Sequence, residues 1–229
     1  MGEKVREKQI YLLESKWRAA RDARNRTEAD GFSRQILRLI ADDDYRADGH
    51  RTYLCDSLLY RGELDKAAAS YLKLVPRGML QETEGYAGLA RIAAERRDFA
   101  RGLSWLERYA KAPGAMCGNC IEWRRYHSHV LSTVWKAAMQ PAPEASLRQI
   151  ISGGGYAPLQ MRLRKIPASL QQESVAQEAR LILAEYLMRE KRIPEAKELF
   201  RELMDKVEKE YRAEHELFLL AEAHLKRLG

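Results

Sequence analysis

Apolar residues recur at spacings of three and four along almost the whole chain, and this periodicity limits the fold more than any other feature. The periodic segments are rich in Ala, Leu, Glu, Lys and Arg, which favour helices. The alternation of β-branched residues that is typical of strands is almost absent. In residues 4–26, for example, Ile10, Leu13 and Trp17 share one side of a helix. The pattern therefore predicts an all-α protein.

Glycines, prolines and short polar breaks divide this pattern into pairs of helices. The predicted pairs occupy residues 51–74, 83–112 and 174–209. Each pair has one internal break, at Gly62, at Arg97-Asp98 and at Lys191-Arg192 respectively. The sequence thus predicts four parts: a helical pair in 1–50, two repeats in 51–114, an irregular helical segment with a glycine-rich loop in 115–173, and a repeat with a C-terminal helix in 174–229.

Three segments share a second pattern, which indicates an internal repeat. In each, a leucine of the first helix precedes a small or short residue, at Leu54, Leu89 and Leu183. Each second helix then has a small residue near its start, at Ala67, Gly102 and Ala196. A small side chain where two helices cross lets their backbones approach. A larger residue one turn later fills the space beside it, and these residues are Tyr71, Leu106 and Phe200.

Ala67 and Gly102 are 35 residues apart, and the tetratricopeptide repeat has a unit of about 34 residues. The three segments resemble that family, as do the terminal prolines Pro76 and Pro113. A fourth unit begins at Leu220-Ala221, whereas residues 115–170 do not match. The resemblance implies a right-handed superhelical stack of antiparallel helix pairs, an α-solenoid, and it implies a binding protein rather than an enzyme.

Tetratricopeptide arrays usually hold a peptide or helix of a partner protein in a concave groove, which the first helix of each pair lines. By this resemblance, the groove positions of the chain are Thr52, Asp56, Tyr60, Glu84, Arg91, Glu95, Glu178, Glu185 and Arg189. Their mixed charges predict a polar peptide as the ligand. The unpaired last helix is expected to dock another copy of the chain.

The formal charge of +7 comes from 40 basic and 33 acidic residues, which is a mild bias. Residues 145–172 contain no acidic residue but include Arg148, Arg162, Arg164 and Lys165. A solvated basic loop accounts for this stretch. A helical repeat that binds nucleic acid is the alternative, and it predicts an affinity that falls steeply with salt.

Cys117 and Cys120 have the spacing of two thiols that chelate a metal or form a reactive disulfide. His127 lies seven residues after Cys120 on the same helical face and is the third candidate ligand for a zinc ion. A second cysteine pair, as in a zinc ribbon, is absent, and a thioredoxin-like motif would follow a strand. Metal binding, redox chemistry and simple packing of the thiols stay open.

The chain has three cysteines, an odd count that fits a reducing compartment, so we expect a cytoplasmic protein. No stretch approaches the run of about 18 apolar residues that a membrane-spanning helix needs. The N-terminal segment has no apolar core of a signal peptide either.

Overall fold

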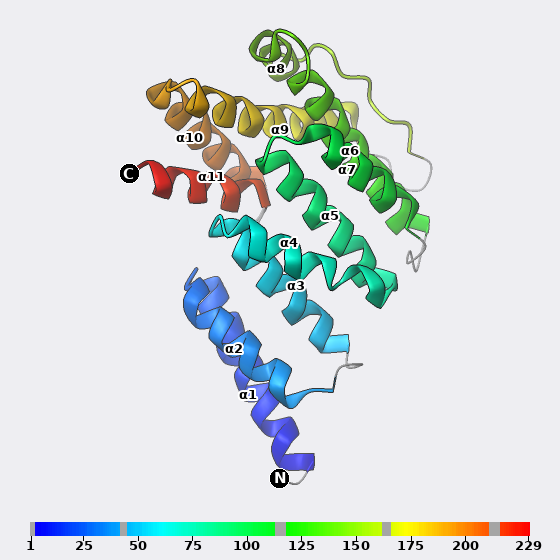
Figure 1. Ribbon diagram of the computed structural model, residues 1–229, viewed down its shortest axis with the longest axis vertical. Coiled ribbons are helices and arrows are strands. Elements are labelled where there is room, and N and C mark those ends of the chain that lie inside the picture. Colours follow the sequence, from blue (N-terminus) through cyan, green and yellow to red (C-terminus); the bar gives the residue numbers. More distant parts are fainter. Residues whose placement is uncertain (1–2, 42–44, 113–117, 162–165, 211–215) are drawn as a thin grey trace. The chain divides into compact units, whose positions relative to one another are not determined.

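The computed structural model describes residues 3–41, 45–112, 118–161, 166–210 and 216–229. These residues form eleven α-helices and one short 3-10 helix, and none of them lies in a strand (Figure 1), which confirms the all-α prediction. The elements are α1 (Glu3–Asp22), α2 (Arg26–Leu39), α3 (Tyr45–Tyr60), α4 (Leu64–Leu72), η1 (Val75–Arg77), α5 (Met79–Glu95), α6 (Phe99–Lys111), α7 (Gly118–Ala138), α8 (Pro143–Ile151), α9 (Ala168–Arg189), α10 (Ile193–Glu210) and α11 (Glu216–Leu228). None of these helices combines the length and the apolar character that crossing a membrane requires.

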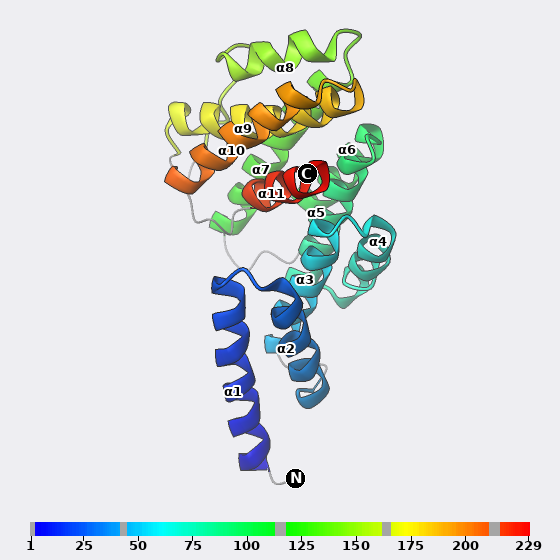
Figure 2. The ribbon, with the colours of Figure 1, turned by 90° about the vertical axis from the view of Figure 1, so that its left-hand side faces the viewer.

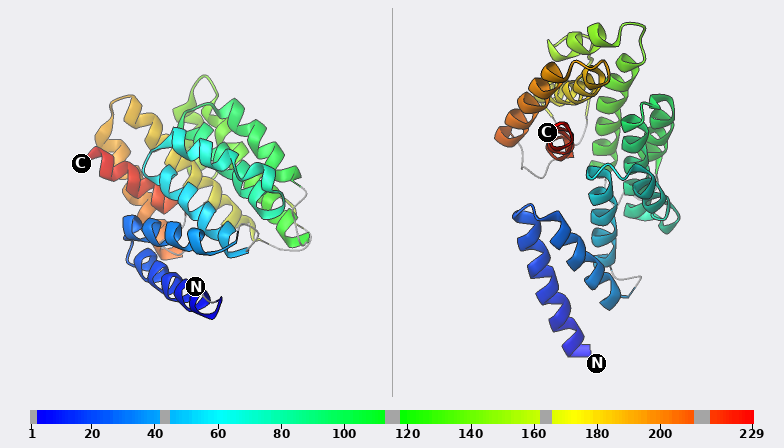
Figure 3. Two further views of the ribbon diagram at one scale, coloured as in Figure 1. Left: turned by 60° about the horizontal axis from the view of Figure 1, so that its bottom comes forward. Right: turned by 60° about the vertical axis from the view of Figure 1, so that its left-hand side comes forward.

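The chain divides into two compact units, residues 1–89 and 90–229, and the boundary falls within α5. In the first unit, α1 packs on α2, α2 on α3, and α3 on α4. Figure 3 shows α1 and α2 side by side. The unit boundary thus cuts through the segment 51–114, which the sequence assigns to two repeats.

Helix α9 is the centre of the second unit, where it contacts α7, α8, α10 and α11. Figure 2 shows α10 running alongside it. Nearly every residue from Val175 to Leu187 is buried, so α9 has no solvent-facing side over this stretch. Its polar residues there therefore need partners from neighbouring helices.

Four connections between helices have the same backbone form. Each has three residues, the second of which has a positive φ, and these second residues are Arg24, Gly62, Arg97 and Lys191. After α5, for example, the N–H groups of Arg97 and Asp98 donate to the carbonyls of Ala94 and Ala93 at 2.7 and 2.8 Å. This Schellman arrangement ends the first helix and starts the second. The predicted breaks at Gly62, Arg97-Asp98 and Lys191-Arg192 are confirmed.

The first helix pair also has the small residue of the repeat. Five residues after each positive φ lies a buried alanine or glycine, at Ala29, Ala67, Gly102 and Ala196. Ser33 stands in α2 where the other pairs have Tyr71, Leu106 and Phe200. Because serine is too small to fill this space, the repeat pattern in the sequence matched three helix pairs and did not include this one.

The segment 115–173 contains a regular helix that the sequence analysis missed. The segment was expected to be irregular and helical with a glycine-rich loop, and it contains the long helix α7 followed by the regular helix α8. Pro143 occupies the first turn of α8, where a proline is well tolerated. Leu147 and Ile150 bury one face of α8, and Gly153 follows its end with a φ of 98°.

In the first unit, the ring of Tyr71 on α4 lies directly against Gly88 of α5. Tyr71 is buried, and its hydroxyl donates a hydrogen bond to Asp56 of α3. A Cβ atom on Gly88 would lie 2.2 Å from Cε1 of this ring. Gly88 is therefore required by the close approach of two helices.

We predict that Gly88→Ala lowers the free energy of unfolding of the first unit by about 1–3 kcal/mol, because the methyl group overpacks the Tyr71 ring. Gly49→Ala in α3 is the matched control, since its Cβ would meet no atom within 4 Å. That control should be neutral or stabilising by about 0.5–1 kcal/mol. Urea denaturation followed by circular dichroism measures both, and equal effects would contradict the packing described.

Candidate functional site

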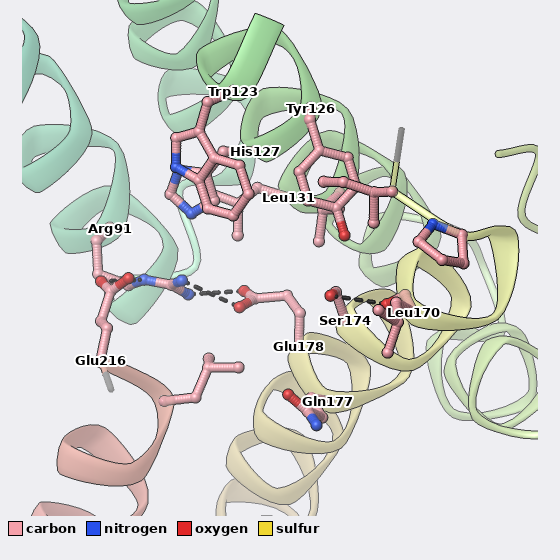
Figure 4. Close-up of a pocket in the computed structure, with 14 residues that line it drawn as sticks. Arg91, Trp123, Tyr126, His127, Leu131, Leu170, Ser174, Gln177, Glu178 and Glu216 are labelled. Atoms are coloured by element: carbon pink, nitrogen blue, oxygen red, sulfur yellow. Dashed lines mark hydrogen bonds and ion pairs between the residues drawn. The ribbon is translucent and has the colours of Figure 1, made fainter. Parts of the chain in front are cut away.

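Arg91 of α5 lies buried where α5, α9 and α11 meet. Its Nη1 and Nη2 donate to the two carboxylate oxygens of Glu178 on α9 at 2.6 and 3.0 Å, and its Nε donates to Glu216 on α11 at 2.9 Å. Burial alone would lower the pKa of Arg91, but the two carboxylates raise it well above its ordinary value. The guanidinium group therefore stays charged and joins three helices (Figure 4).

Glu178 has a third donor in Trp135 of α7. The indole Nε1 donates to Glu178 Oε1 at 3.1 Å, and the Arg91 guanidinium lies 5.8 Å from the centre of the Trp135 ring. Gly102 of α6 lies against the same ring, since a Cβ there would be 2.9 Å from Cζ3. Each charge of the buried pair is thus compensated by charge-assisted hydrogen bonds.

A second cluster joins the same three helices. His224 Nε2 of α11 lies 3.1 Å from Glu185 Oε1 of α9 and 3.4 Å from Glu95 Oε2 of α5. The imidazole ring stacks on Phe200 of α10, with 5.0 Å between the ring centroids. All three ionisable side chains are buried, so the positive charge of His224 helps to compensate the two carboxylates.

The two carboxylates and the imidazole shift each other's protonation. Burial, together with the negative charge of Glu95, raises the pKa of Glu185 to about 7. Burial alone would lower the pKa of His224, but the two carboxylates raise it to about 9. Burial opposes ionisation of Glu95, yet contact with His224 holds its pKa below the usual value. At neutral pH the cluster therefore contains a charged Glu95 and a protonated His224.

Glu95, Glu185 and His224 also form the one group of three metal-capable side chains found within the described ranges, with ligand atoms within 4.8 Å of one another. Positive charge is already present there, because Arg91 acts on Glu95 and the Arg227 guanidinium lies 3.3 Å from His224 Nδ1. These charges would repel a divalent cation. We therefore interpret the group as a hydrogen-bonded ion cluster.

A pocket of about 430 Å³ opens beside the Arg91–Glu178 pair. Figure 4 shows side chains of α7 on one side of it and side chains of α9 on the other. Apolar side chains of both helices line it, and they include Trp123, Val130, Leu131 and Leu170. Trp123 and Leu170 are 44% and 49% exposed, so the pocket has an accessible apolar rim. Sequence analysis missed this pocket, because helical periodicity does not show which apolar faces stay uncovered.

Four of the nine predicted groove residues meet in the two clusters: Arg91, Glu95, Glu178 and Glu185. Their side chains are buried and contact α11 or each other, and their part in partner binding stays a prediction. The last helix is also not unpaired, since α11 packs on α9 and α10 of its own chain. Whether it docks a second copy stays a prediction.

Of the other five predicted groove residues, one lies in the second unit and four lie in the first. Arg189 is exposed and donates to the backbone carbonyl of Glu95 at 2.8 Å. The remaining four lie half-buried in the first unit, and they are Thr52, Asp56, Tyr60 and Glu84. Their part in partner binding stays a prediction.

Two of the other sequence predictions fall partly on residues that the structure does not describe. Cys117 and the basic residues Arg162, Arg164 and Lys165 lie outside the described ranges. Cys120 is exposed, while the His127 ring packs edge-on against Tyr109 with 5.8 Å between centroids and lines the pocket. Zinc binding and nucleic-acid binding stay predictions.

We predict that Glu178→Gln lowers the free energy of unfolding of the second unit by roughly 3–5 kcal/mol, because it leaves the Arg91 charge poorly compensated. Glu216 contacts the same guanidinium but is 32% exposed. Glu216→Gln should therefore cost only about 1 kcal/mol or less. Urea denaturation followed by tryptophan fluorescence compares them, and an equal loss for both would refute the proposed importance of burial.

The His224 cluster predicts a pH dependence. The folded pKa of Glu185 is raised from 4.5 to about 7 and that of His224 from 6.5 to about 9. A raised folded pKa stabilises the fold fully below the unfolded value, and this contribution is lost as the pH rises through the folded value. The urea midpoint of the second unit should therefore fall between pH 4.5 and 9, with the Glu185 part lost between pH 4.5 and 7 and the His224 part between pH 6.5 and 9.

The same titration of Glu185→Gln is the control. It should lose the decrease between pH 4.5 and 7 that belongs to Glu185, and it should keep only a smaller decrease above pH 6.5, because Glu95 alone then raises the pKa of His224. A wild-type midpoint that stays constant or rises over this range would contradict the charge assignment.

No family model matches this chain, and neither a curated protein nor a solved structure matches it significantly. The resemblance to tetratricopeptide repeats therefore rests on the residues of the repeat pattern.

Proposed function

We propose that this protein is an interaction module, and that its second unit binds a segment of a partner protein with an apolar side chain in the pocket between α7 and α9. The observation that carries the proposal is the pocket itself, with its volume of about 430 Å³ and its apolar lining. Binding sites for small groups typically have volumes in this range. Apolar anchors that fill such pockets contribute much of the affinity of protein interfaces.

The exposed rim supports a protein partner. Trp123 and Leu170 each keep almost half of their surface accessible although they border a cavity. Large apolar side chains gathered at one place commonly mark interaction sites. The Arg91–Glu178 pair also lines the pocket and adds charged groups that orient a ligand.

The proposal keeps the adaptor role that the repeats suggest but changes the chemistry of the ligand. Because four of the polar groove residues are buried in ion clusters, we propose an apolar anchor in place of a wholly polar peptide. The four matching turns support a tetratricopeptide-like stack of helix pairs as the scaffold. We propose no reaction for the buried charges, because they hold helices together.

We predict that Ser174→Phe, which places a ring in the pocket, abolishes partner binding. Ser174 is a half-buried lining residue of α9. Ser104→Phe is the matched control, since Ser104 is exposed on α6 and does not line the pocket. Proteins retrieved by the wild type and by Ser104→Phe, identified by mass spectrometry, should be lost with Ser174→Phe.

A dye-binding measurement tests the same pocket without a partner. An environment-sensitive apolar dye such as anilinonaphthalene sulfonate should fluoresce with the wild type and with Ser104→Phe, and several-fold less with Ser174→Phe. If Ser174→Phe retains both the dye signal and the retrieved proteins, the pocket is not the binding site.

A further inference from the structure

The side chain of Gln171, near the start of α9, is saturated with hydrogen bonds to the chain segment that precedes this helix. Its Nε2 donates to the carbonyls of Leu159 and Ile166 at 3.1 and 3.0 Å. Its Oε1 accepts hydrogen bonds from the N–H of Leu159 and from the hydroxyl of Tyr156, both at 2.9 Å. An amide side chain has two donors and two acceptor lone pairs, so every polar group of the Gln171 side chain has a partner.

These contacts hold residues 156–161, which we call the anchored segment, against α9. The segment has no regular secondary structure, so its backbone groups need partners from outside it. Gln171 is almost completely buried and serves both backbone groups of Leu159. On α7, His129 Nε2 donates to the carbonyl of Ala157 at 2.8 Å. The anchored segment is thus held by α7 and by α9, the two helices between which the pocket opens.

Gln171 does not line the pocket, but it holds residues that do. The lining includes Ile166 and Pro167, which precede α9, and Leu170 of its first turn. The backbone N–H of Gln171 also donates to the carbonyl of Pro167 at 3.1 Å. A buried amide that lost Leu159 would have two unsatisfied groups, and turning it toward new partners would break its bond to Ile166 as well. The position of this part of the lining therefore depends on a side chain outside the pocket.

We propose that Gln171 is a positioning residue of the pocket, and that it couples ligand binding to attachment of the anchored segment. This inference rests on the proposed function, because it takes the pocket as the binding site. A ligand that contacts Ile166 and Pro167 binds the form in which Gln171 holds them in place. By linkage, the bound ligand stabilises the attached segment to the same extent. Detachment of the anchored segment thus weakens binding from a point outside the lining.

The first test compares two neighbouring glutamines in the full chain. Gln171→Met keeps the length of the side chain and removes its hydrogen bonds. Titration with anilinonaphthalene sulfonate should give a dissociation constant about fivefold or more above that of the wild type, the size of effect expected for a lost hydrogen bond. Gln172→Met is the matched control, since Gln172 donates to the Ile150 carbonyl of α8 at 3.1 Å but does not line the pocket. Its dissociation constant should stay close to that of the wild type, and equal effects of the two changes would overturn the proposal.

Hydrogen exchange of the Leu159 N–H, followed by NMR, distinguishes positioning from a general loss of stability. This N–H donates to Gln171, so it exchanges when the anchored segment detaches. In the wild type, dye at about ten times its dissociation constant should slow this exchange about tenfold, because the dye binds the attached form. The same relative concentration should have no such effect on Gln171→Met. Exchange in the wild type that is insensitive to bound dye overturns the proposal, and this measurement needs no variant if Gln171→Met fails to fold.

The outcomes for Gln171 and for the proposed function are distinguishable. If Ser174→Phe loses dye binding while Gln171→Met keeps the affinity of the wild type, the pocket is the binding site and Gln171 does not position it. If Ser174→Phe keeps both the dye signal and the retrieved proteins, the pocket is not the binding site and both proposals fail.

Discussion

The ion pair between Arg91 and Glu178 is the contact on which the arrangement of the second unit depends. It joins α5 and α9 through two residues that are 87 positions apart in the sequence. It also forms hydrogen bonds with Trp135 of α7 and Glu216 of α11. Burying two charges is costly, and apolar residues of similar volume often give equal or greater stability. The pair therefore serves mainly to specify which helices meet and in which register. The His224 cluster, one or two turns along the same helices, repeats this arrangement.

The Arg91–Glu178 pair connects the stability of the second unit with the proposed function, because both residues also line the pocket. Arg91, Glu178 and Glu216 hold α11 on α5 and α9, and they also line the pocket proposed to bind a partner. The apolar pocket beside the first turn of α11 adds a contact that α11 leaves unfilled.

Much of the fold was predictable from sequence, because helical periodicity and turn residues are local signals. Even the turns without glycine at the left-handed position followed the pattern, since Arg97 and Lys191 take the same positive φ as Gly62. Helix α8 was missed because Pro143 indicates a break as readily as a helix start. Such ambiguity is resolved by burial of Leu147 and Ile150, which depends on the tertiary structure.

The candidate site was only half predictable. Spacing showed that Arg91 and Glu95 share one face of a helix, but it could not show that α11 covers this face or that Glu178 supplies the opposite charge. A polar residue on a helical face has the same pattern whether it is solvated or paired within a core. Long-range pairing of this kind requires the structure, and the nine groove residues divide accordingly into four that are buried and five that are not.

A double-mutant cycle between Arg91 and Glu178 tests this account most directly. Each single change to methionine leaves the other charge buried, whereas the double variant removes both charges and keeps most of the volume. The account predicts a coupling energy of about 3 kcal/mol or more in the free energy of unfolding, with the double variant near the stability of the wild type. Single effects that add to within about 0.5 kcal/mol would contradict it.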